Sequence, residues 1–190
     1  MPKIVCVNKK SKGYNTPEDL QKIIHYAYNP LKTTEDTIRP GHAIGDYTGC
    51  YPFMGPEYLT HDETAVSSHM ILNNEIYGKS HGNLIRHWVI SFHKSDYVMP
   101  CDAADLGNFL IHVLGQNYIS AFGVHMDTYY IHTHLIINCI NWHDGKRYDV
   151  SYEGKWISSM VEGWYQIHMD NLIKDVEARK RYEAYLYGEH

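Results

Sequence analysis

The chain has 190 residues, enough for one domain with a sizeable buried core. Its composition, 44% hydrophobic and 21% charged, is that of a globular protein, and no apolar run is long enough to cross a membrane. The net charge of −5 is unusual for a nucleic-acid binder, because Lys and Arg contacts to phosphates supply much of the affinity for DNA; residues 1–40 nevertheless carry a net +3.

The amino terminus and the cysteines predict where the protein works. The first residues lack an apolar signal-peptide core, and the four cysteines are scattered without C-x-x-C spacing. Both features predict a cytoplasmic protein with reduced thiols and argue against a zinc site built from cysteines. We expect residues 1–190 to form a single domain and, because the chain ends within helix-like sequence, to be the N-terminal part of a longer protein.

A first strand is predicted at residues 4–7 and a first helix from Thr16 to Asn29. Thr16 is suited to be the N-cap and Pro17 the first helical residue, and Asn29-Pro30 ends the helix. The apolar stripe of this helix consists of Leu20, Ile23, Ile24 and Ala27. Tyr26 lies about 110° from the centre of that stripe, at its border. A tyrosine there can lie on the core and reach into a cleft, although spacing alone favours an ordinary surface tyrosine.

Residues 34–62 show no clear period and are predicted to be loop, with room for one short strand. Aromatic residues in this loop either pack ordinarily or stack DNA bases along a groove. They are Tyr47, Tyr51, Phe53 and Tyr58. A helix is predicted at 64–77 and a half-buried strand at 84–93. Asp102 opens an amphipathic helix that ends at Gly115. Its apolar face is predicted to consist of Leu106, Phe109, Leu110, Val113 and Leu114.

Residues 121–140 read as two apolar runs joined by a short polar turn, with three histidines where the runs meet. Alternation along the second strand puts His132, His134 and Asn138 on one face, with the Cα atoms of the two histidines about 6.6 Å apart. If residues 128–131 form a hairpin turn, His125 faces this pair across the strands. Three neutral imidazoles leave coordination positions open, as in a catalytic metal site. The alternative is a pair of polar-face histidines, in a chain with 14 His.

Asp127 follows His125 by two residues, and its role stays open between two functions. It accepts a ring N–H from a histidine and so fixes the tautomer, or it takes a proton from a nucleophile. Both functions suit a carboxylate beside a metal site.

The rest of the chain is predicted to be a hairpin followed by helix. Asp144-Gly145 predicts a tight turn that returns through residues 147–150. Residues 155–187 are helical in pattern, with a weak point at Gly163. Basic residues of this tail, which either face solvent or contact phosphates, are Lys174, Arg179, Lys180 and Arg181. Hairpins without regular βαβ alternation predict an α+β domain, a mainly antiparallel sheet with helices packed on it.

Two motifs carry a resemblance to a known family. The pattern H-x-D-x(4)-H-x-H-x(3)-N, from His125 to Asn138, is similar to the third motif of plasmid mobilisation relaxases of the MobP/VirD-like type, which are DNA-nicking HUH endonucleases. Residues 24–33, Ile-His-Tyr-Ala-Tyr-Asn-Pro-Leu-Lys-Thr, resemble the first motif. Residues 45–50 resemble a Gly-x-x-Cys-like loop of the family, and residues 87–92 one of its strands. The likeness covers most of residues 20–150.

The resemblance implies a fold and a set of site residues. The fold is a five-stranded palm-like sheet. A divalent metal ion, Mn, Mg or Zn, is held by His125, His132 and His134. Tyr26 is the nucleophile, with Tyr28 as the fallback. Asp127 is implied as a catalytic group, and the supporting or DNA-contacting residues are Tyr28, Lys32 and Asn138.

The resemblance also implies an activity. The protein nicks single-stranded DNA at an origin of transfer by tyrosine transesterification, forms a 5′-phosphotyrosyl intermediate and rejoins the strand during conjugative transfer. The implied partners are single-stranded or hairpin DNA, accessory relaxosome proteins and a coupling protein, with no membrane.

Three other interpretations stay open. A rolling-circle replication initiator or single-strand transposase of the same superfamily generally has its tyrosine after the histidine strand; candidates are Tyr165, Tyr182 and Tyr185. A second is a non-catalytic, metal-stabilised DNA-binding module. A third is a hydrolase that attacks with metal-bound water and uses Asp127 as base. The Asn29-Pro30 context of Tyr26 favours the relaxase.

Overall fold

The computed structural model describes residues 1–7, 13–34 and 47–187. The strands are β1 (Lys3–Cys6), β2 (Thr48–Tyr51), β3 (Ile85–Phe92), β4 (Tyr118–His125) and β5 (Ile131–Asn141). The helices are α1 (Pro17–Ala27), α2 (Pro30–Thr33), α4 (Glu63–Ile76), α5 (Pro100–Leu114), α6 (Glu153–Lys174) and α7 (Val176–Tyr187), with short 3-10 helices η2 (Glu57–His61) and η3 (Lys94–Asp96). Among the described residues, none of these helices meets the length and apolarity needed to cross a bilayer.

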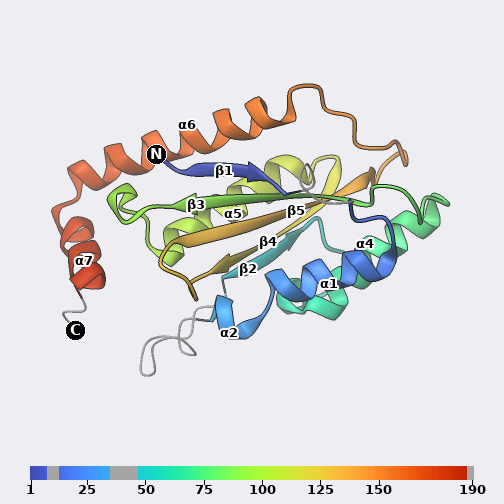
Figure 1. Ribbon diagram of the computed structural model, residues 1–190, viewed down its shortest axis with the longest axis horizontal. Helices are drawn as coiled ribbons and strands as arrows, with labels where there is room; N and C mark the ends of the chain where they lie inside the picture. The colour runs from blue at the N-terminus through green and yellow to red at the C-terminus, as the bar shows by residue number, and fades with distance from the viewer. Residues whose placement is uncertain (8–12, 35–46, 188–190) are drawn as a thin grey trace.

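The five strands form one sheet in the order β1-β3-β5-β4-β2, and every neighbouring pair is antiparallel (Figure 1). This arrangement confirms the predicted α+β fold with a five-stranded antiparallel sheet. The longest strand, β5, lies at the centre of the sheet, so both of its edges are paired, one with β3 and the other with β4.

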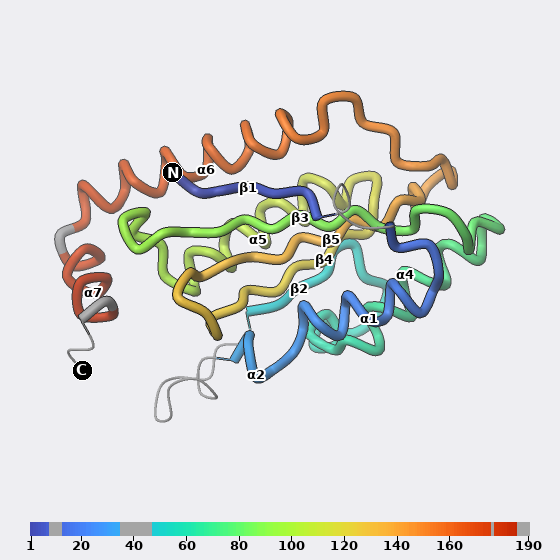
Figure 2. Tube along the Cα trace, viewed as in Figure 1, coloured from blue at the N-terminus to red at the C-terminus, as the bar shows by residue number. Residues whose placement is uncertain are grey.

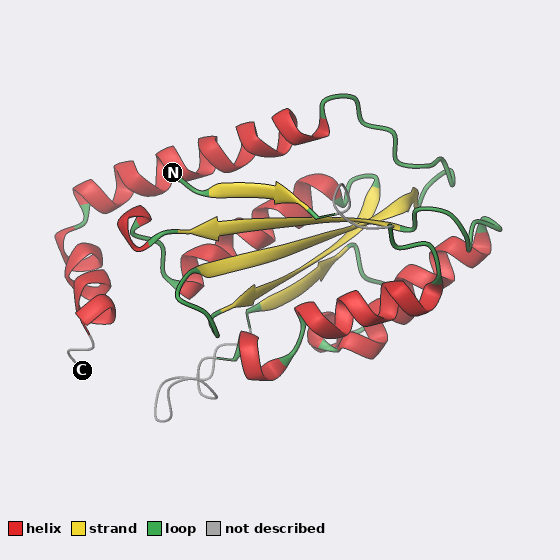
Figure 3. Cartoon of the chain, in the orientation of Figure 1, coloured by secondary structure: helices red, strands yellow, loops and turns green. Residues whose placement is uncertain are grey.

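Helices cover both faces of the sheet, as Figure 3 shows in the same orientation. One face packs against α5 and the beginning of α6, and this cluster includes Trp88, Leu106, Leu110, Phe122, Leu135 and Ile157. The other face packs against α1 and α4, and this cluster includes Leu20, Ile24, Met70, Ile85, Ala121 and Ile136. His132 and His134 share the second face, because they alternate with Thr133 and Leu135 along β5.

The first helix begins and ends as its sequence predicts. Thr16 is the N-cap: its hydroxyl accepts the Asp19 backbone N–H at 3.2 Å, and the Asp19 carboxylate accepts the Thr16 N–H in return. After Ala27 the chain turns at once into α2, because Pro30 starts that helix and the Asn29 side chain accepts the Leu31 N–H at 3.0 Å. The Asn-Pro pair therefore ends one helix and starts the next.

Two predicted helix boundaries are wrong. The α5 helix begins at Pro100, with Asp102 in its third position, where the carboxylate accepts the Met99 N–H at 2.8 Å; Phe109 is exposed rather than buried. The long C-terminal helix breaks at Asp175 and not at Gly163. The Asp175 carboxylate accepts the Ala178 N–H at 3.0 Å and so begins α7, whereas Gly163 stays within α6.

Two other predictions hold only in part. The turn at Gly145 forms, with φ of +69°, but the returning segment pairs with β5 only through one bridge between Ile140 and Arg147.

The predicted loop at 34–62 contains β2, the edge strand that pairs with β4, and residues 35–46 lie outside the described residues. The Gly-x-x-Cys-like stretch therefore ends in a strand. Among the loop aromatics, Tyr47, Tyr51 and Phe53 pack against the core and Tyr58 is exposed.

Candidate active site

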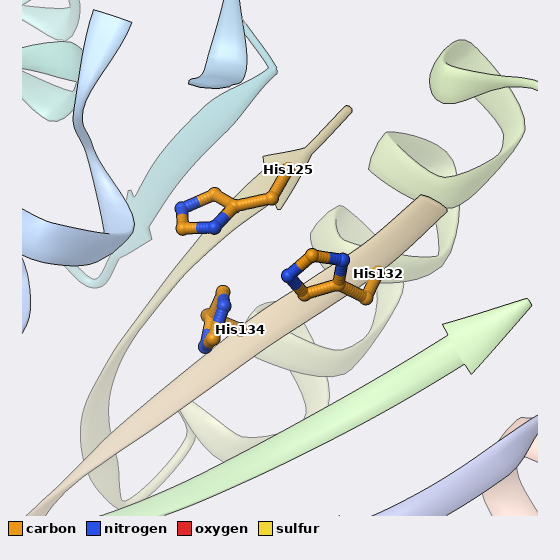
Figure 4. Close-up of side chains that lie close together, drawn as sticks. All are labelled: His125, His132 and His134. Carbon is orange, nitrogen blue, oxygen red and sulfur yellow. The ribbon is translucent and has the colours of Figure 1, made fainter. Parts of the chain in front are cut away.

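Three histidines meet at the ends of β4 and β5, where the two strands join in a hairpin. The register places His125 directly opposite His132, and His134 opposite Gly123. One ring nitrogen from each of the three lies within 4.8 Å of the others, and Figure 4 shows the rings turned toward a shared space. The hairpin and the shared face predicted from the spacing are confirmed.

Hydrogen bonds to carbonyl oxygens set the tautomers of two of the rings. His125 Nε2 lies 3.2 Å from the Ala27 carbonyl, and His132 Nδ1 lies 3.0 Å from the Tyr130 carbonyl. A carbonyl only accepts, so both nitrogens donate and the opposite nitrogen of each ring keeps its lone pair. Among the residues that the structure describes, His125 Nδ1 and His134 Nε2 are buried and have no hydrogen-bond partner. Unsatisfied buried nitrogens that converge on one point fit a divalent metal ion.

Burial also keeps the imidazoles of His125 and His134 neutral, which is the state that binds a metal. It lowers the pKa of His125 to about 4, with help from neighbouring His132. The pKa of His134 is lowered further, again mainly by burial and then by the surrounding histidines. At neutral pH both rings therefore present lone pairs rather than charges.

Tyr26 lies over this cluster. It is in the last turn of α1, and its ring centroid is 5.1 Å from that of His125 and 5.2 Å from that of His134. The side chain remains 42% exposed, so a substrate can reach it. At the border of the apolar stripe, Tyr26 therefore packs on two buried histidines and stays open to solvent.

Gly123 of β4 allows the end of α1, which carries Tyr26, to pack closely on the sheet. This residue was not singled out from the sequence. A Cβ on Gly123 would lie 2.0 Å from the Ala27 carbonyl oxygen, so only a glycine lets the end of α1 pack on β4 at this point. The same carbonyl accepts from His125. A glycine inside an apolar strand was the available signal, since it often marks a close backbone approach.

Lys32 and Asp127 form an ion pair beside Tyr26. The Lys32 ammonium lies 3.1 Å from the Asp127 carboxylate and 4.5 Å from the centre of the Tyr26 ring. Burial works against the charged Lys32, but its hydrogen bonds with Asp127 and Tyr26 prevail and raise its pKa. For Asp127, burial is outweighed by Lys32 and the pKa is lowered, so the carboxylate is ionised. The ring N–H of His125 is donated to the Ala27 carbonyl rather than to Asp127.

Two other candidates from the sequence, Tyr28 as the alternative nucleophile and Asn138 as a supporting residue, are buried and hydrogen-bonded within the fold. Tyr28 is buried, and its hydroxyl donates to the carbonyls of Gly49 and Thr60. Asn138 is also buried. Its amide donates to the Met70 carbonyl and so ties β5 to α4, and its oxygen accepts the Ile140 N–H within β5.

The tyrosines after the histidine strand are also engaged elsewhere. The Tyr165 hydroxyl donates to Asp96 and the Tyr182 hydroxyl to the Lys94 carbonyl. The Tyr185 ring lies beside that of Tyr182, tilted by 39° with centroids 6.5 Å apart.

Comparison with known proteins agrees with this geometry. The family model for the nuclease domain of MobA/VirD2-like relaxases matches residues 55–163, more than half of the chain. This stretch contains β3, α5, β4 and β5, and with them all three histidines and Asp127. The chain therefore belongs to the family of MobA/VirD2-like relaxase nuclease domains, which are enzymes.

Individual relatives carry relaxase names as well. The chain is 36% identical over 75 residues to "Protein rlx" of Staphylococcus aureus, a match that covers 40% of this chain and 22% of that protein. It is 25% identical over 141 residues to the group II intron-interrupted relaxase LtrB of Lactococcus lactis subsp. cremoris, covering 70% of this chain and 25% of that protein. The chain thus corresponds to about a quarter or less of the length of these relatives.

Proposed function

We propose that this domain nicks single-stranded DNA at an origin of transfer by attack of Tyr26, and later rejoins the strand during conjugative transfer. The observation that carries the proposal is the contact of the Tyr26 ring with both His125 and His134. Tyr26 lies before the stretch matched by the family model, so its role rests on this geometry and on the motif around Asn29-Pro30.

The three histidines are proposed to hold a divalent metal ion. Imidazole nitrogens suit Zn²⁺ well and Mg²⁺ poorly, since Mg²⁺ prefers oxygen ligands, so among Mn, Mg and Zn the ligand set favours Zn and disfavours Mg. When bound, such an ion would polarise the non-bridging oxygens of the scissile phosphate.

Tyr26, Lys32 and Asp127 are proposed to perform the nucleophilic step. The Tyr26 oxygen forms a bond to phosphorus while the bond from phosphorus to the 3′ oxygen breaks, which leaves a 5′-phosphotyrosyl link and a free 3′-OH. The phenol must lose its proton, and an ordinary tyrosine pKa near 10 leaves little phenolate at neutral pH. The ionised Asp127 takes that proton, and the Lys32 ammonium stabilises the phenolate charge. The 3′ oxygen takes a proton from water as it leaves.

The fate of the strand follows from this chemistry. One phosphate ester replaces another, so the 3′-OH of a strand end can attack the phosphotyrosyl link and restore the DNA. The proposed partners are therefore single-stranded or hairpin DNA at the transfer origin, together with accessory relaxosome proteins and a coupling protein. Tyr26 lies before the histidine strand and in contact with it, which favours a relaxase over a replication initiator or transposase.

A denaturing gel tests the proposal. A pool of single-stranded oligonucleotides with a randomised central region is labelled at the 3′ end and incubated with the protein and Mn²⁺ or Zn²⁺. We expect a labelled protein–DNA adduct, because the 5′-phosphotyrosyl link stays on the 3′ fragment, and no adduct from the same pool labelled at the 5′ end.

Two variants form a matched pair in this assay. Tyr26→Phe should abolish the adduct with little change in stability. Tyr28→Phe should keep the adduct but lose about 1–3 kcal/mol of stability, because it leaves buried carbonyls without a donor. The opposite pattern would assign the nucleophile to Tyr28, and a metal-dependent cleavage without any adduct would favour a water-attacking hydrolase.

A further inference from the structure

A fourth histidine, His87, lies directly behind one of the three proposed ligands. It is on β3, on the same face as the site, one diagonal step from His134 on the neighbouring strand β5. Its ring is buried, and its Nε2 lies 2.8 Å from His134 Nδ1. His87 is not part of the cluster whose nitrogens converge on the metal position.

A tyrosine continues this chain of hydrogen bonds away from the site. The Tyr14 hydroxyl lies 3.0 Å from His87 Nδ1. Tyr14 is held in place by its own backbone, because its carbonyl accepts the Leu84 N–H at 2.8 Å, next to the start of β3. Three rings, Tyr14, His87 and His134, therefore form a line that ends at His134 Nε2, a buried nitrogen with no hydrogen-bond partner in the described part of the chain.

The direction of these hydrogen bonds follows from proton counting. A neutral imidazole carries one proton, so a lone pair at His134 Nε2 requires the proton at Nδ1. Nδ1 then donates to His87 Nε2, which must accept. The single proton of His87 consequently lies on Nδ1 and is donated to the Tyr14 oxygen. Without a metal the opposite direction is equally consistent, with the Tyr14 hydroxyl donating and His134 Nε2 protonated and unable to bind.

We propose that His87 is a positioning residue that accepts the His134 Nδ1 proton, and that it thereby holds His134 in the tautomer and orientation that bind the metal, with Tyr14 completing the relay. The inference rests on the proposed metal site and deepens it. Outer partners of this kind orient ligating histidines and typically change metal affinity by about 10- to 100-fold. The Ala27 and Tyr130 carbonyls do the same for the other two ligands, whereas His134 relies on a side chain that can be exchanged.

The direct test is the tautomer of the wild-type protein loaded with Zn²⁺, read from long-range ¹H–¹⁵N spectra of the histidine rings. We expect His134 and His87 each to carry the proton on Nδ1. A proton on His87 Nε2 in the zinc-loaded protein would overturn the proposal, and this measurement does not depend on any variant folding.

Zn²⁺ affinity by calorimetry gives the second readout, independent of DNA cleavage. His87→Leu fills the space with an apolar side chain but removes the hydrogen-bond acceptor of His134, and should weaken Zn²⁺ binding by about 10- to 100-fold. His87→Gln offers an amide oxygen as acceptor and should recover most of that loss, while His69→Leu, a partly buried histidine that packs on Phe53, should bind as the wild type does. Wild-type affinity in a folded His87→Leu protein would contradict the inference.

The two proposals fail in different ways. Absence of zinc binding in the wild type would remove the metal site and with it this inference. Normal zinc binding that depends on His87, without a DNA adduct, would leave the inference standing and remove only the proposed cleavage.

Discussion

His134 is a buried imidazole that the protein keeps neutral and prepared for a ligand. Burial lowers its pKa, and the neighbouring ring of His87 hydrogen-bonds its Nδ1. Its Nε2 has no hydrogen bond to any residue that the structure describes. A buried polar atom in that state costs free energy unless something binds it. At the scale of single residues, the site is therefore built at the expense of stability.

Removal of the His134 imidazole tests whether this residue is a metal ligand. His134→Ala should weaken Zn²⁺ binding by about two orders of magnitude or more, because metal-binding free energies of about 10–16 kcal/mol are shared among a few ligands. Calorimetry measures the affinity. The control is His143→Ala, because that exposed histidine packs on Trp142 and bonds the Gln116 carbonyl and is not part of the three-histidine cluster. Unchanged zinc affinity in His134→Ala would refute the ligand assignment.

The lowered pKa values also predict how stability depends on pH in the metal-free protein. Burial lowers the pKa of His87 to about 4, and that of His125 to about 4, from an ordinary value of 6.5. Between pH 6.5 and pH 4 these two histidines bind protons in the unfolded chain but not in the folded protein. Their contribution to the free energy of unfolding is therefore fully present above pH 6.5 and falls as the pH is lowered toward 4.

For His87 the loss amounts to about 2 kcal/mol at pH 5, and urea unfolding in the presence of a chelator measures it. The His87→Leu variant should lose less stability than the wild type between pH 7 and pH 5. Equal losses in the two proteins would show that His87 does not titrate in this way.

At the scale of elements, the site depends on how closely α1 approaches β4. The Ala27 carbonyl at the end of α1 lies where a side chain of residue 123 would begin, and it also bonds His125. The next element, α2, is tied to the end of β4 by the Met126 N–H, which donates to the Lys32 carbonyl at 2.9 Å. The contact of α1 with β4 thus positions Tyr26, and the hydrogen bond from Met126 positions Lys32.

Two glycine substitutions should have opposite effects on stability. Gly123→Ala forces a methyl group against the Ala27 backbone and should cost about 1–3 kcal/mol, with loss of the DNA adduct because Tyr26 is displaced from the histidines. Gly163→Ala adds a methyl group in open space within α6 and should add about 0.5–1 kcal/mol. Thermal unfolding measures both. A stable and fully active Gly123→Ala protein would contradict this account of how α1 is positioned.

At the scale of the whole molecule, local features were predictable from sequence and distant contacts were not. The pairing of His125 with His132 is local, because β4 and β5 form a hairpin and period-two alternation decides which side chains share a face. The helix start at Thr16 likewise depends only on nearby residues.

The contacts that complete the site join segments far apart in the chain, and no local pattern encodes them. His87 reaches His134 only because β3 pairs with β5, and this depends on the strand order of the sheet. The break at Asp175 was missed for a different reason, since a capping side chain determined it and a glycine was a poorer guide. Figure 2 follows the chain through these elements, from β1 near the N-terminus to α7.

The central claim is that Tyr26 is the nucleophile of this domain. The most direct measurement is mass mapping of the covalent adduct formed by the wild-type protein with single-stranded DNA, after digestion of both the protein and the DNA. We predict a nucleotide-modified peptide that contains Tyr26, with fragmentation that locates the phosphate on that residue. A phosphate located instead on Tyr165, Tyr182 or Tyr185 would contradict the account, because the nucleophile would then follow the histidine strand, as in replication initiators and transposases.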